Sequence, residues 1–238
     1  MILSIVIPVY NEVNTIGKII INVDSVELNN FHKQIIVVDD FSSDGTREYL
    51  KELKSKRPNY TILFHNRNCG KGRAIRTALE QVIGDYTIIQ DADLEYDPND
   101  YFSLLEYIQT NKLKILYGSR VLEHNNKEKI QNFSQRFRIF ANYVLTKINN
   151  IINDQKLTDA HTCYKLFDSE LFKSITLKEN GFAFCPEITT KVSILNYKIY
   201  EIPINYKGRN YKDGKKIKFR DGIEAIIALI KYRYFKSI

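Results

Sequence analysis

Apolar residues gather in five short segments in the first half of the chain, and each segment ends at polar or turn-forming residues. The segments are Leu3–Val9, Ile35–Val38, Thr61–Phe64, Tyr86–Ile89 and Lys114–Tyr117. Short runs of this kind, rich in β-branched residues, are typical of strands that are buried on both faces of a sheet. The pattern therefore predicts five buried strands.

The stretches between these segments have helix-like patterns and suitable start residues. Helices are expected over about residues 44–56, 70–82 and 98–110, with Asp44 as a cap of the first and Pro98 near the start of the third. Repeated strand–helix–strand units predict an α/β fold in which helices cover both faces of a mostly parallel central sheet. Ligands bind such sheets beyond the carboxyl ends of the strands, so functional residues are expected there.

Polar residues follow each expected strand. They occupy positions 10–12, 39–46, 66–72, 91–95 and 118–120, and they include acids, a glycine-rich basic loop and an arginine. Each segment has an ordinary structural explanation when taken alone. Asp39 and Asp40 could end a strand and cap a helix, and residues 91–98 could form a solvated acidic loop or a loose calcium loop. Their common position at one edge of the sheet favours a shared ligand site.

Three acids alternate in the segment after the fourth strand. Asp91, Asp93 and Glu95 would lie on one face of an extended segment, because alternate side chains share a face. Such carboxylates make an oxygen site for a hard cation, Mg²⁺ or Mn²⁺, which normally completes its shell with substrate phosphates. The glycines around Lys71 open a helix, so Lys71 and backbone N–H groups can face an anion. A Walker A spacing and a G-x-G-x-x-G turn are both absent from the sequence.

The composition narrows the class of protein. The 238 residues are enough for one large domain that buries a core without a covalent staple. Cys69, Cys163 and Cys185 form neither a C-x-x-C motif nor an even set, which argues against a disulfide scaffold or structural zinc and for a reducing compartment. The first residues do not resemble a signal peptide, and no apolar run of about 18 residues occurs. We therefore expect a cytoplasmic location.

The net charge of +7 is concentrated at one end of the chain. Residues 207–238 contain ten basic and three acidic residues, which account for the whole excess. Such an asymmetry predicts an anionic partner, which could be nucleic acid, a membrane surface or a phosphorylated ligand. The apolar segment Ile223–Ile230 is followed by basic and aromatic residues. We expect an amphipathic helix that either packs on the domain or lies on an anionic membrane, peripherally at its cytoplasmic face.

The polar segments also carry a family resemblance. IVIPVYNE, VVDDFSSDGT, NCGKGRAIRTAL, DADLEYDP and GSR occur in this order within residues 2–120. With these motifs the chain resembles inverting glycosyltransferases of family two with the GT-A fold, within the branch of dolichyl- and polyprenyl-phosphate mannosyltransferases and related sugar synthases. TDAHTCYKLF, GFAFCPEIT and IPINYKGRNYKDGKKIKFRDG extend the resemblance to about residue 221. A single GT-A domain is therefore expected over residues 1–221, followed by a basic amphipathic helix over residues 222–238.

The resemblance implies a nucleoside-diphosphate sugar (GDP- or UDP-sugar) as donor and a divalent cation, Mg²⁺ or Mn²⁺, as cofactor. The motif positions that it implies for nucleotide-sugar binding are Pro8, Tyr10, Glu12, Asp39, Asp40, Lys71, Arg73, Asp91, Arg209, Lys215 and Lys216. The implied metal ligands are Asp91, Asp93 and Glu95, where Glu95 stands at a position that is often Gln in relatives. Arg120 matches the arginine that meets an acceptor phosphate, with Arg136 or Arg138 as a second contact.

The acceptor implied by the resemblance is a polyprenyl or dolichyl phosphate, and a glycan hydroxyl in surface polysaccharide synthesis is the alternative. The expected catalytic residues are Asp93, Arg120 and Asp159. A lipid phosphate is already anionic and needs no general base, whereas a hydroxyl needs one, for which Asp159 or Glu187 is a candidate. Such synthases often have an S-G-F-type segment after an Asp. Here Asp159 is followed by Ala-His-Thr-Cys, and we interpret His161 and Cys163 as packing residues.

Three other classes of protein share some of these sequence features. A nucleotidyltransferase typically has a glycine- and arginine-rich loop after its first strand, but this chain has Pro-Val-Tyr-Asn-Glu there. A nucleic-acid-binding module would explain the basic end but not the acids at the sheet edge, so we expect no nucleic-acid partner. A non-catalytic sugar-nucleotide binder is a further alternative, although the acids and the basic loop of an enzyme are all present.

Overall fold

The computed structural model of the chain describes residues 1–122, 133–208 and 219–235. Its strands are β1 (Ile2–Val9), β2 (His32–Asp39), β3 (Thr61–Phe64), β4 (Tyr86–Ile89), β5 (Ile115–Ser119), β6 (Lys165–Asp168) and β7 (Tyr200–Pro203). Its α-helices are α1 (Ile16–Ser25), α2 (Thr46–Lys56), α3 (Lys71–Leu79), α4 (Tyr101–Thr110), α5 (Phe133–Asn153), α6 (Ser169–Ser174), α7 (Phe184–Ile194) and α8 (Phe219–Ile230). A 3₁₀ turn, η1 (Pro98–Asp100), precedes α4, and a π-helical turn, η4 (Lys231–Phe235), follows α8.

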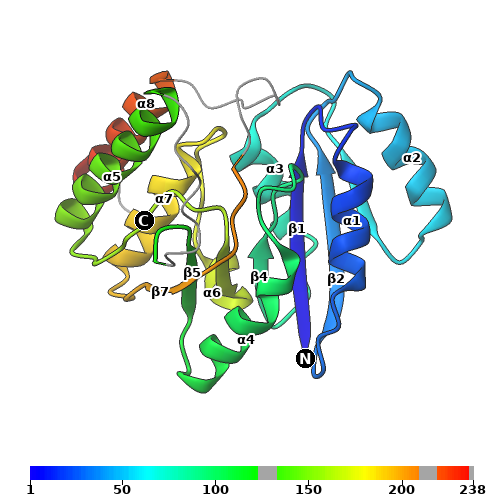
Figure 1. Cartoon of the computed structure of the whole chain (residues 1–238), viewed down its shortest axis with the longest axis horizontal. Helices are drawn as coiled ribbons and strands as arrows, with labels where there is room; N and C mark the ends of the chain where they lie inside the picture. The colour runs from blue at the N-terminus through cyan, green and yellow to red at the C-terminus, as the bar shows by residue number, and fades with distance from the viewer. Residues whose placement is uncertain (123–132, 209–218, 236–238) are drawn as a thin grey trace.

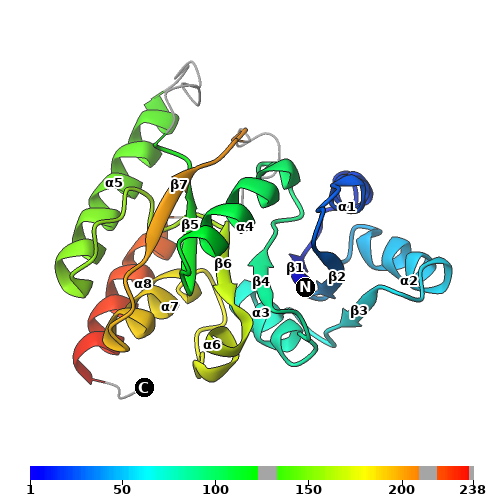
Figure 2. The same cartoon turned by 90° about the horizontal axis from the view of Figure 1, so that it is seen from below.

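The strands form one mixed sheet in the order β3-β2-β1-β4-β6-β5-β7 (Figures 1 and 2). Each pairing is parallel except the two that β6 makes with β4 and β5. Figure 2 shows α1 and α4 on one face of the sheet and α3, α6 and α7 on the other. The expected α/β fold with a mostly parallel sheet and helices on both faces is therefore confirmed.

All five expected strands are present, and β3 and β4 have the expected bounds. The two further strands, β6 and β7, are short and carry polar residues, so they lack a continuous apolar run. The expected helices begin one to three residues later. Gly45 in a left-handed conformation precedes α2, and a 3₁₀ turn separates Pro98 from α4. Helix α3 ends at Leu79, because the N–H groups of the next residues bond to carbonyls three positions back.

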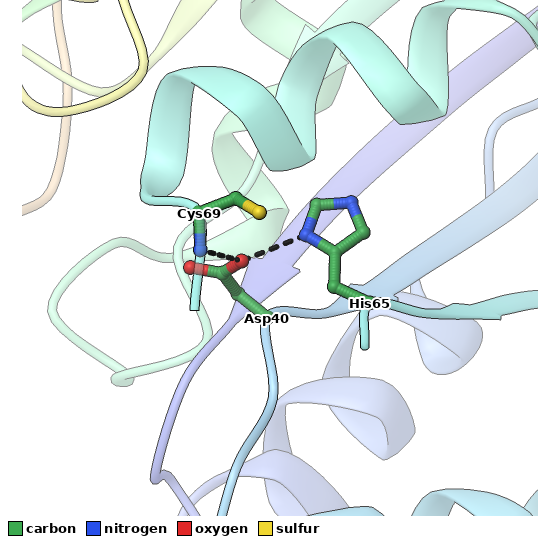
Figure 3. Close-up of side chains that lie close together, drawn as sticks. All are labelled: Asp40, His65 and Cys69. Atoms are coloured by element: carbon green, nitrogen blue, oxygen red, sulfur yellow. Dashed lines mark hydrogen bonds and ion pairs between the residues drawn. The ribbon is translucent and has the colours of Figure 1, made fainter. Parts of the chain in front are cut away.

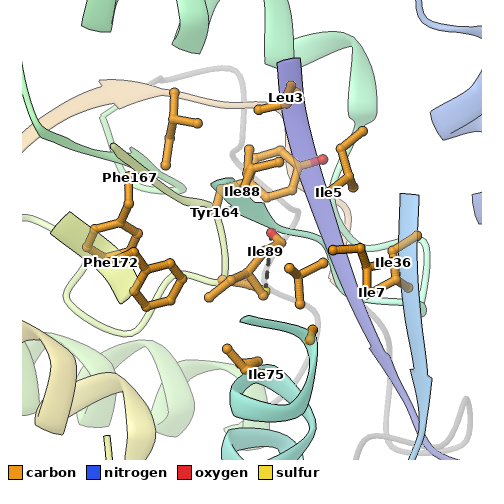
Figure 4. Close-up of a cluster of buried hydrophobic side chains, with 14 of the residues drawn as sticks. Leu3, Ile5, Ile7, Ile36, Ile75, Ile88, Ile89, Tyr164, Phe167 and Phe172 are labelled. Atoms are coloured by element: carbon orange, nitrogen blue, oxygen red, sulfur yellow. Dashed lines mark hydrogen bonds between the residues drawn. The ribbon is translucent and has the colours of Figure 1, made fainter. Parts of the chain in front are cut away.

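The core surrounds the sheet (Figure 4). Side chains of β1 are buried on both faces of the sheet, as the apolar run predicted. Beyond β4, Phe167 of β6 stacks on Phe172 of α6 with ring centroids 4.3 Å apart. Burial of each such side chain contributes about 1.5–3 kcal/mol, so the strands hold the sheet edge in place for the loops that follow them.

Strand direction decides which loops meet at that edge. The carboxyl ends of the parallel strands lie at one edge of the sheet, where ligands bind in folds of this kind. Because β6 runs the opposite way, the residues that precede it, Asp159–Tyr164, reach the same edge. The sheet therefore adds a segment to the functional edge that an all-parallel arrangement would place at the opposite end.

Helices α5, α7 and α8 pack together beyond β5 and β7 (Figures 1 and 2). Ala228 of α8 and the following Tyr232 are buried against Ala183, and the Tyr232 hydroxyl donates to Glu179 at 2.7 Å. The expected C-terminal helix thus packs on the domain, and it begins three residues before the expected Gly222. Within the described residues, no helix combines the length and apolar character that crossing a bilayer requires.

Gly118 in β5 tests the packing at this edge. A Cβ atom there would lie 2.6 Å from Ile204 Cγ2 and 3.1 Å from Tyr164 Cβ. We expect Gly118→Ala to lower the free energy of unfolding by about 1–3 kcal/mol, because the added methyl group overpacks a filled site. Urea denaturation measures this, with Gly181→Ala as the control, since a Cβ at Gly181 meets nothing within 4 Å. Equal stability of the two variants would contradict the packing described here.

Candidate active site

A cleft with a cavity of about 540 Å³ opens at the carboxyl edge of the sheet. Many of the residues singled out from the sequence line it, namely Pro8, Tyr10, Glu12, Asp40, Lys71, Asp91, Asp93, Glu95 and Arg120. Pro8 lies near the end of β1, and the others follow one of four strands or open α3, so residues far apart in the sequence converge as expected from the parallel sheet. The polar residues expected at one edge of the sheet therefore line one cavity.

Other predicted site residues lie elsewhere. Asp39 is buried at the end of β2, where its Oδ1 accepts the Ser42 N–H at 3.2 Å and Arg47 lies 3.6 Å from Oδ2. Arg73 is exposed and is absent from the cleft wall, because helical geometry directs Lys71 and Ala74 toward the cleft instead. Asp159 is fully buried behind the wall. Arg209, Lys215 and Lys216, and the side chains of Arg136 and Arg138, lie outside what the structure describes.

Lys71 and Asp91 form an ion pair inside the cleft. Lys71 Nζ, on the first residue of α3, lies 2.5 Å from Asp91 Oδ1 and 3.4 Å from Cys163 Sγ. Burial alone would lower the pKa of Lys71 and raise the pKa of Asp91, but their mutual attraction outweighs burial and shifts both pKa values the opposite way. The carboxylate therefore stays ionised and holds a positive charge at this point. Ionised carboxylates attract cations and offer oxygen ligands. The side chains of Asp91 and Asp93 therefore fit a hard divalent cation.

The acidic segment after β4 is a turn rather than the extended segment expected from the sequence. Ala92 and Asp93 lie in the turn, and Leu94 has a φ of 63°, a left-handed conformation that is rare for a residue with a Cβ. Asp93 Oδ1 accepts the Glu95 N–H at 3.2 Å, and Glu95 Oε2 accepts the hydroxyl of Tyr206 at 2.7 Å. The three acids therefore do not share the face of a strand, and Glu95 is directed to Tyr206. Left-handed strain of this kind concentrates at functional sites.

Asp40 fixes the loop that precedes α3 (Figure 3). Its Oδ1 accepts the Cys69 N–H at 2.8 Å and its Oδ2 accepts the Gly70 N–H at 2.7 Å. His65 Nδ1 lies 2.7 Å from Oδ1, and its Nε2 lies 3.0 Å from the Thr77 hydroxyl. Both carboxylate oxygens are thus engaged by the protein itself, which sets the start of α3 and so the position of its first side chain.

The same three residues are the closest group of potential metal ligands in the described part of the chain. Their ligand atoms, on Asp40, His65 and Cys69, all lie within 4.8 Å of one another. Asp91, Asp93 and Glu95 do not gather their oxygens as closely within these described ranges. A cation at Asp91 and Asp93 would therefore complete its shell from a bound substrate rather than from a third nearby carboxylate.

Arg120, in the cleft wall, forms a bidentate ion pair with Asp159, which lies behind the wall. Arg120 Nε donates to Asp159 Oδ2 at 2.6 Å, and Nη2 donates to Oδ1 at 2.7 Å. Asn142 of α5 donates to Oδ1 at 3.2 Å, and Glu201 of β7 accepts the Asp159 N–H at 2.9 Å. Burial would raise the pKa of Asp159, but Arg120 outweighs it and lowers this pKa to about 2. Arg120 is thereby held rigidly, with its guanidinium 5.1 Å from the centre of the Tyr206 ring.

This arrangement bears on the two candidate general bases. Asp159 has a low pKa and both of its oxygens are engaged, so it is poorly suited to accept a proton from a hydroxyl. Glu187 is fully buried in α7, where it accepts the N–H groups of Lys178 and Glu179 and pairs with Lys191 at 2.9 Å. Neither carboxylate belongs to the cleft wall.

The cleft also contains residues that sequence reasoning did not assign to it. These are Tyr96, His161, Cys163, Phe182, Cys185 and Tyr206, among others. His161 and Cys163 reach the cleft because β6 is antiparallel, a reversal that the apolar pattern does not signal. Burial and Asp91 raise the pKa of the Cys163 thiol well above its usual range, so it is a neutral packing group rather than a nucleophile.

The Arg120–Asp159 pair predicts a specific acid dependence of stability. The pKa of Asp159 falls from 3.8 to about 2 on folding, so its ionisation stabilises the fold fully above pH 4. We expect about 2 kcal/mol of this stability to be lost as the pH falls from about 4 to 2. Asp159→Asn should be less stable at pH 7, because Arg120 loses its partner, and should lose less stability over that acid range. Urea denaturation at several pH values measures this, and parallel acid limbs for the two proteins would disprove it.

The chain is similar to several known glycosyltransferases. It is 28% identical to a dolichyl-phosphate beta-glucosyltransferase of Trichomonas vaginalis, in an alignment covering 99% of this chain and 74% of the relative. It is 27% identical to a dolichol-phosphate mannosyltransferase of Pyrococcus furiosus, over 91% of this chain and 61% of that protein. The fold matches a glucosyl-3-phosphoglycerate synthase from Mycobacterium tuberculosis, crystallised with Mn²⁺, UDP and phosphoglyceric acid. The TM-score is 0.68 at 14% identity, over 99% of this chain and 79% of that one.

A family model also matches the chain, in agreement with the fold and the motifs. The model of glycosyl transferase family 2 matches residues 4–176, a segment that runs from β1 through α6 and includes the described cleft residues up to Cys163. The family expected from the motifs is confirmed. The chain therefore belongs to glycosyltransferase family 2, and it is a glycosyltransferase with the GT-A fold.

Proposed function

We propose that the enzyme transfers a sugar from a nucleoside-diphosphate sugar to a polyprenyl or dolichyl phosphate, with inversion at the anomeric carbon. The observation that carries this proposal is one cleft that contains both the acids Asp91 and Asp93 and the rigidly held Arg120. Acids of this kind suit the metal-bound diphosphate of a donor, and a fixed guanidinium suits a phosphate acceptor. In this proposal Asp91 and Asp93 bind the metal-bound donor, and Arg120 binds the anionic acceptor in the same cavity.

The donor side of the cleft supports departure of a nucleoside diphosphate. Asp91 and Asp93 would hold the cation, which supplies Lewis-acid neutralisation of the leaving diphosphate when it is bound. Lys71 is a positive group that can turn from Asp91 to the diphosphate once a cation takes over that carboxylate. Pro8, Tyr10 and Glu12 border the nucleotide in this proposal. Arg209, Lys215 and Lys216, outside the described residues, would add positive charge over the diphosphate.

The acceptor side favours a phosphate over a sugar hydroxyl. A phosphate oxygen is ionised near neutral pH and attacks without a general base, whereas a hydroxyl needs one. The two carboxylates considered for that task, Asp159 and Glu187, are buried outside the cleft wall and engaged in ion pairs. The two relatives described above are named for dolichyl or dolichol phosphate, and one is named for glucose and the other for mannose. They support the acceptor class and leave the sugar open.

The outer surface of α5 supports a lipid-linked acceptor. The helix buries Thr146, Asn149 and Asn153, with Asn142 half-buried on the same side, whereas most of its exposed side chains are apolar. The exposed apolar side chains of α5, and of α8 with the following turn, are Ile139, Phe140, Tyr143, Val144, Ile151, Ile223, Ile227, Ile230, Tyr234 and Phe235, each between 36% and 82% exposed. We call these residues the α5–α8 face. Because α5 and α8 pack against each other, these ten side chains gather on two neighbouring helices, which is more than the scattered exposed apolar residues of an ordinary surface.

The charge around the α5–α8 face indicates what that partner is. Lys147 of α5 is exposed, and Arg233 follows α8 and is half-buried. Apolar side chains flanked by lysine and arginine are typical of helices that lie in the interface of an anionic bilayer. We therefore propose that the α5–α8 face rests on an anionic membrane, which would bring the lipid-linked phosphate to the enzyme.

Asp93→Ala tests the donor site. We expect metal-dependent transfer to fall by at least about 10³-fold, because the diphosphate loses charge neutralisation as it leaves. Radiolabelled GDP- and UDP-sugars with polyprenyl phosphate and Mn²⁺ measure transfer, and thermal shifts with each nucleotide identify the donor. Glu106→Ala, which removes an exposed carboxylate on α4, is the control and should retain activity. Full activity of Asp93→Ala, or no transfer to polyprenyl phosphate by the natural enzyme, would disprove the proposal.

Vesicle sedimentation tests the membrane proposal. We expect the natural protein to sediment with vesicles of phosphatidylcholine and phosphatidylglycerol, and less so at high salt, because surface charge is screened. Phe140→Glu and Ile151→Glu should each reduce the bound fraction several-fold. Ile83→Glu is the matched control, since Ile83 is 71% exposed in the loop before β4, far from the α5–α8 face. If all three substitutions had the same effect, the α5–α8 face would not be the membrane surface.

A further inference from the structure

His161 is a cleft residue to which the proposed function gives no task. It lies in the turn before β6 and lines the same cavity as Arg120. Its Nε2 is buried and has no hydrogen-bond partner among the described residues. Buried polar atoms in native proteins nearly always have a partner, so an exception in a ligand cavity indicates a group that a ligand satisfies.

The turn that carries His161 is held firmly on both sides. Asp159 is fixed by Arg120, and the Ala160 carbonyl accepts the Lys165 ammonium at 3.0 Å. The Cys163 N–H donates to the Tyr96 hydroxyl at 2.9 Å. These bonds fix the backbone around His161 and leave its side-chain torsions unrestrained, so a small rotation of the ring can present Nε2 to a ligand in the cavity. The fixed backbone therefore keeps the imidazole beside the cavity.

The charges around the imidazole determine its protonation. Lys165 and Arg120 are the positive groups that face it, and Asp159 is the negative one. Burial and the Lys165 charge lower the pKa of His161 to about 4, so the ring is neutral at physiological pH. A neutral imidazole carries one N–H and cannot act as a cation toward a phosphate. It can still donate one hydrogen bond next to the permanent charge of Arg120.

We propose that His161 is an acceptor-binding residue whose Nε2–H donates to an oxygen of the acceptor phosphate beside Arg120. This inference rests on the proposed transfer to a lipid phosphate and deepens it. The phosphate would form an ion pair with Arg120 and accept a hydrogen bond from the neutral His161 ring. That bond would give His161 Nε2 the partner that it lacks among the described residues. A phosphate fits better than a sugar hydroxyl, because the positive charges of Arg120 and Lys165 outnumber the one negative charge of Asp159 around His161.

Kinetics of His161→Leu and His161→Gln in the full chain test the inference. Leucine removes the donor at similar size, whereas glutamine keeps an N–H. We expect His161→Leu to raise the KM for polyprenyl phosphate by about 10- to 100-fold, as for loss of a hydrogen bond to a charged group. The KM for the sugar nucleotide should stay within about threefold. His161→Gln should recover most of the acceptor affinity, and His32→Gln, which changes an exposed histidine, is the control.

A second measurement does not depend on turnover. In protein labelled with ¹⁵N at histidine, we expect His161 to be the neutral Nε2–H tautomer between pH 5.5 and 8.5. Its Nε2–H resonance should shift when polyprenyl phosphate is added, and should not shift with the nucleotide alone. This measurement separates a ligand contact from a packing role, because a packing residue would show no response specific to the acceptor.

Three results would overturn the inference. One is an unchanged acceptor KM in a folded His161→Leu variant. Another is a rise in the KM for the sugar nucleotide alone, which would place His161 at the donor. The third is a pH–rate limb in the natural enzyme that disappears in His161→Gln, which would make the residue a general base. Failure of the proposed function is recognised separately, because the natural enzyme itself would then transfer no sugar to polyprenyl phosphate.

Discussion

The ion pair between Arg120 and Asp159 is the interaction on which the cleft most depends. It joins the end of β5 to the turn before β6, and through Asp159 it also joins α5 and β7. A buried pair of this kind recovers the cost of removing two charges from water only when its geometry is good and its remaining lone pairs are satisfied. Both conditions are met here, since each oxygen of Asp159 accepts at least two hydrogen bonds from Arg120 or Asn142. The guanidinium is therefore fixed before any ligand arrives.

Two other acids organise the cleft in the same way. Asp40 holds the loop that opens α3, and Asp91 holds the ammonium of Lys71, the first residue of that helix. Asp40 thus fixes the backbone just before Lys71, and Asp91 fixes the ammonium at the end of its side chain. Prearranged charges of this kind need little reorganisation when a substrate binds, which is what stabilisation of a charged transition state requires.

Much of this organisation could be predicted from the sequence, because strands buried on both faces of a sheet appear in it as short apolar runs. Buried apolar runs located five strands, and the residues after them supplied most of the cleft wall that the structure describes. The direction of a strand relative to its neighbours has no comparable signal in the sequence. The reversal of β6, a four-residue strand that contains a buried lysine, could not be read from periodicity, so the contribution of His161 and Cys163 was missed.

The local conformation of the acidic segment was the other error, and its cause is tertiary. Alternating acids suggested an extended segment, but the turn at Leu94 is supported from outside the segment. The Tyr206 hydroxyl binds Glu95, and the Lys207 N–H donates to the Glu95 carbonyl at 2.8 Å. These partners lie more than one hundred residues further along the chain. No local pattern can report a conformation that such distant contacts impose.

Helix α5 shows how the acceptor end and the outer surface depend on each other. The polar side chains on its inner side bind neighbouring elements. Asn142 donates to Asp159 and Thr146 accepts the Ala160 N–H in the turn before β6, and Asn153 donates to Thr190 of α7. With polar contacts on its inner side, the helix leaves several of its large apolar side chains on its outer face. In an ordinary domain that would be unfavourable, since the apolar side chains would remain in water. If the outer face rests on a bilayer, the one helix both positions Arg120 through Asp159 and places the cleft beside the lipid that carries the acceptor. The inverted pattern of α5 is then a consequence of the reaction that the cleft performs.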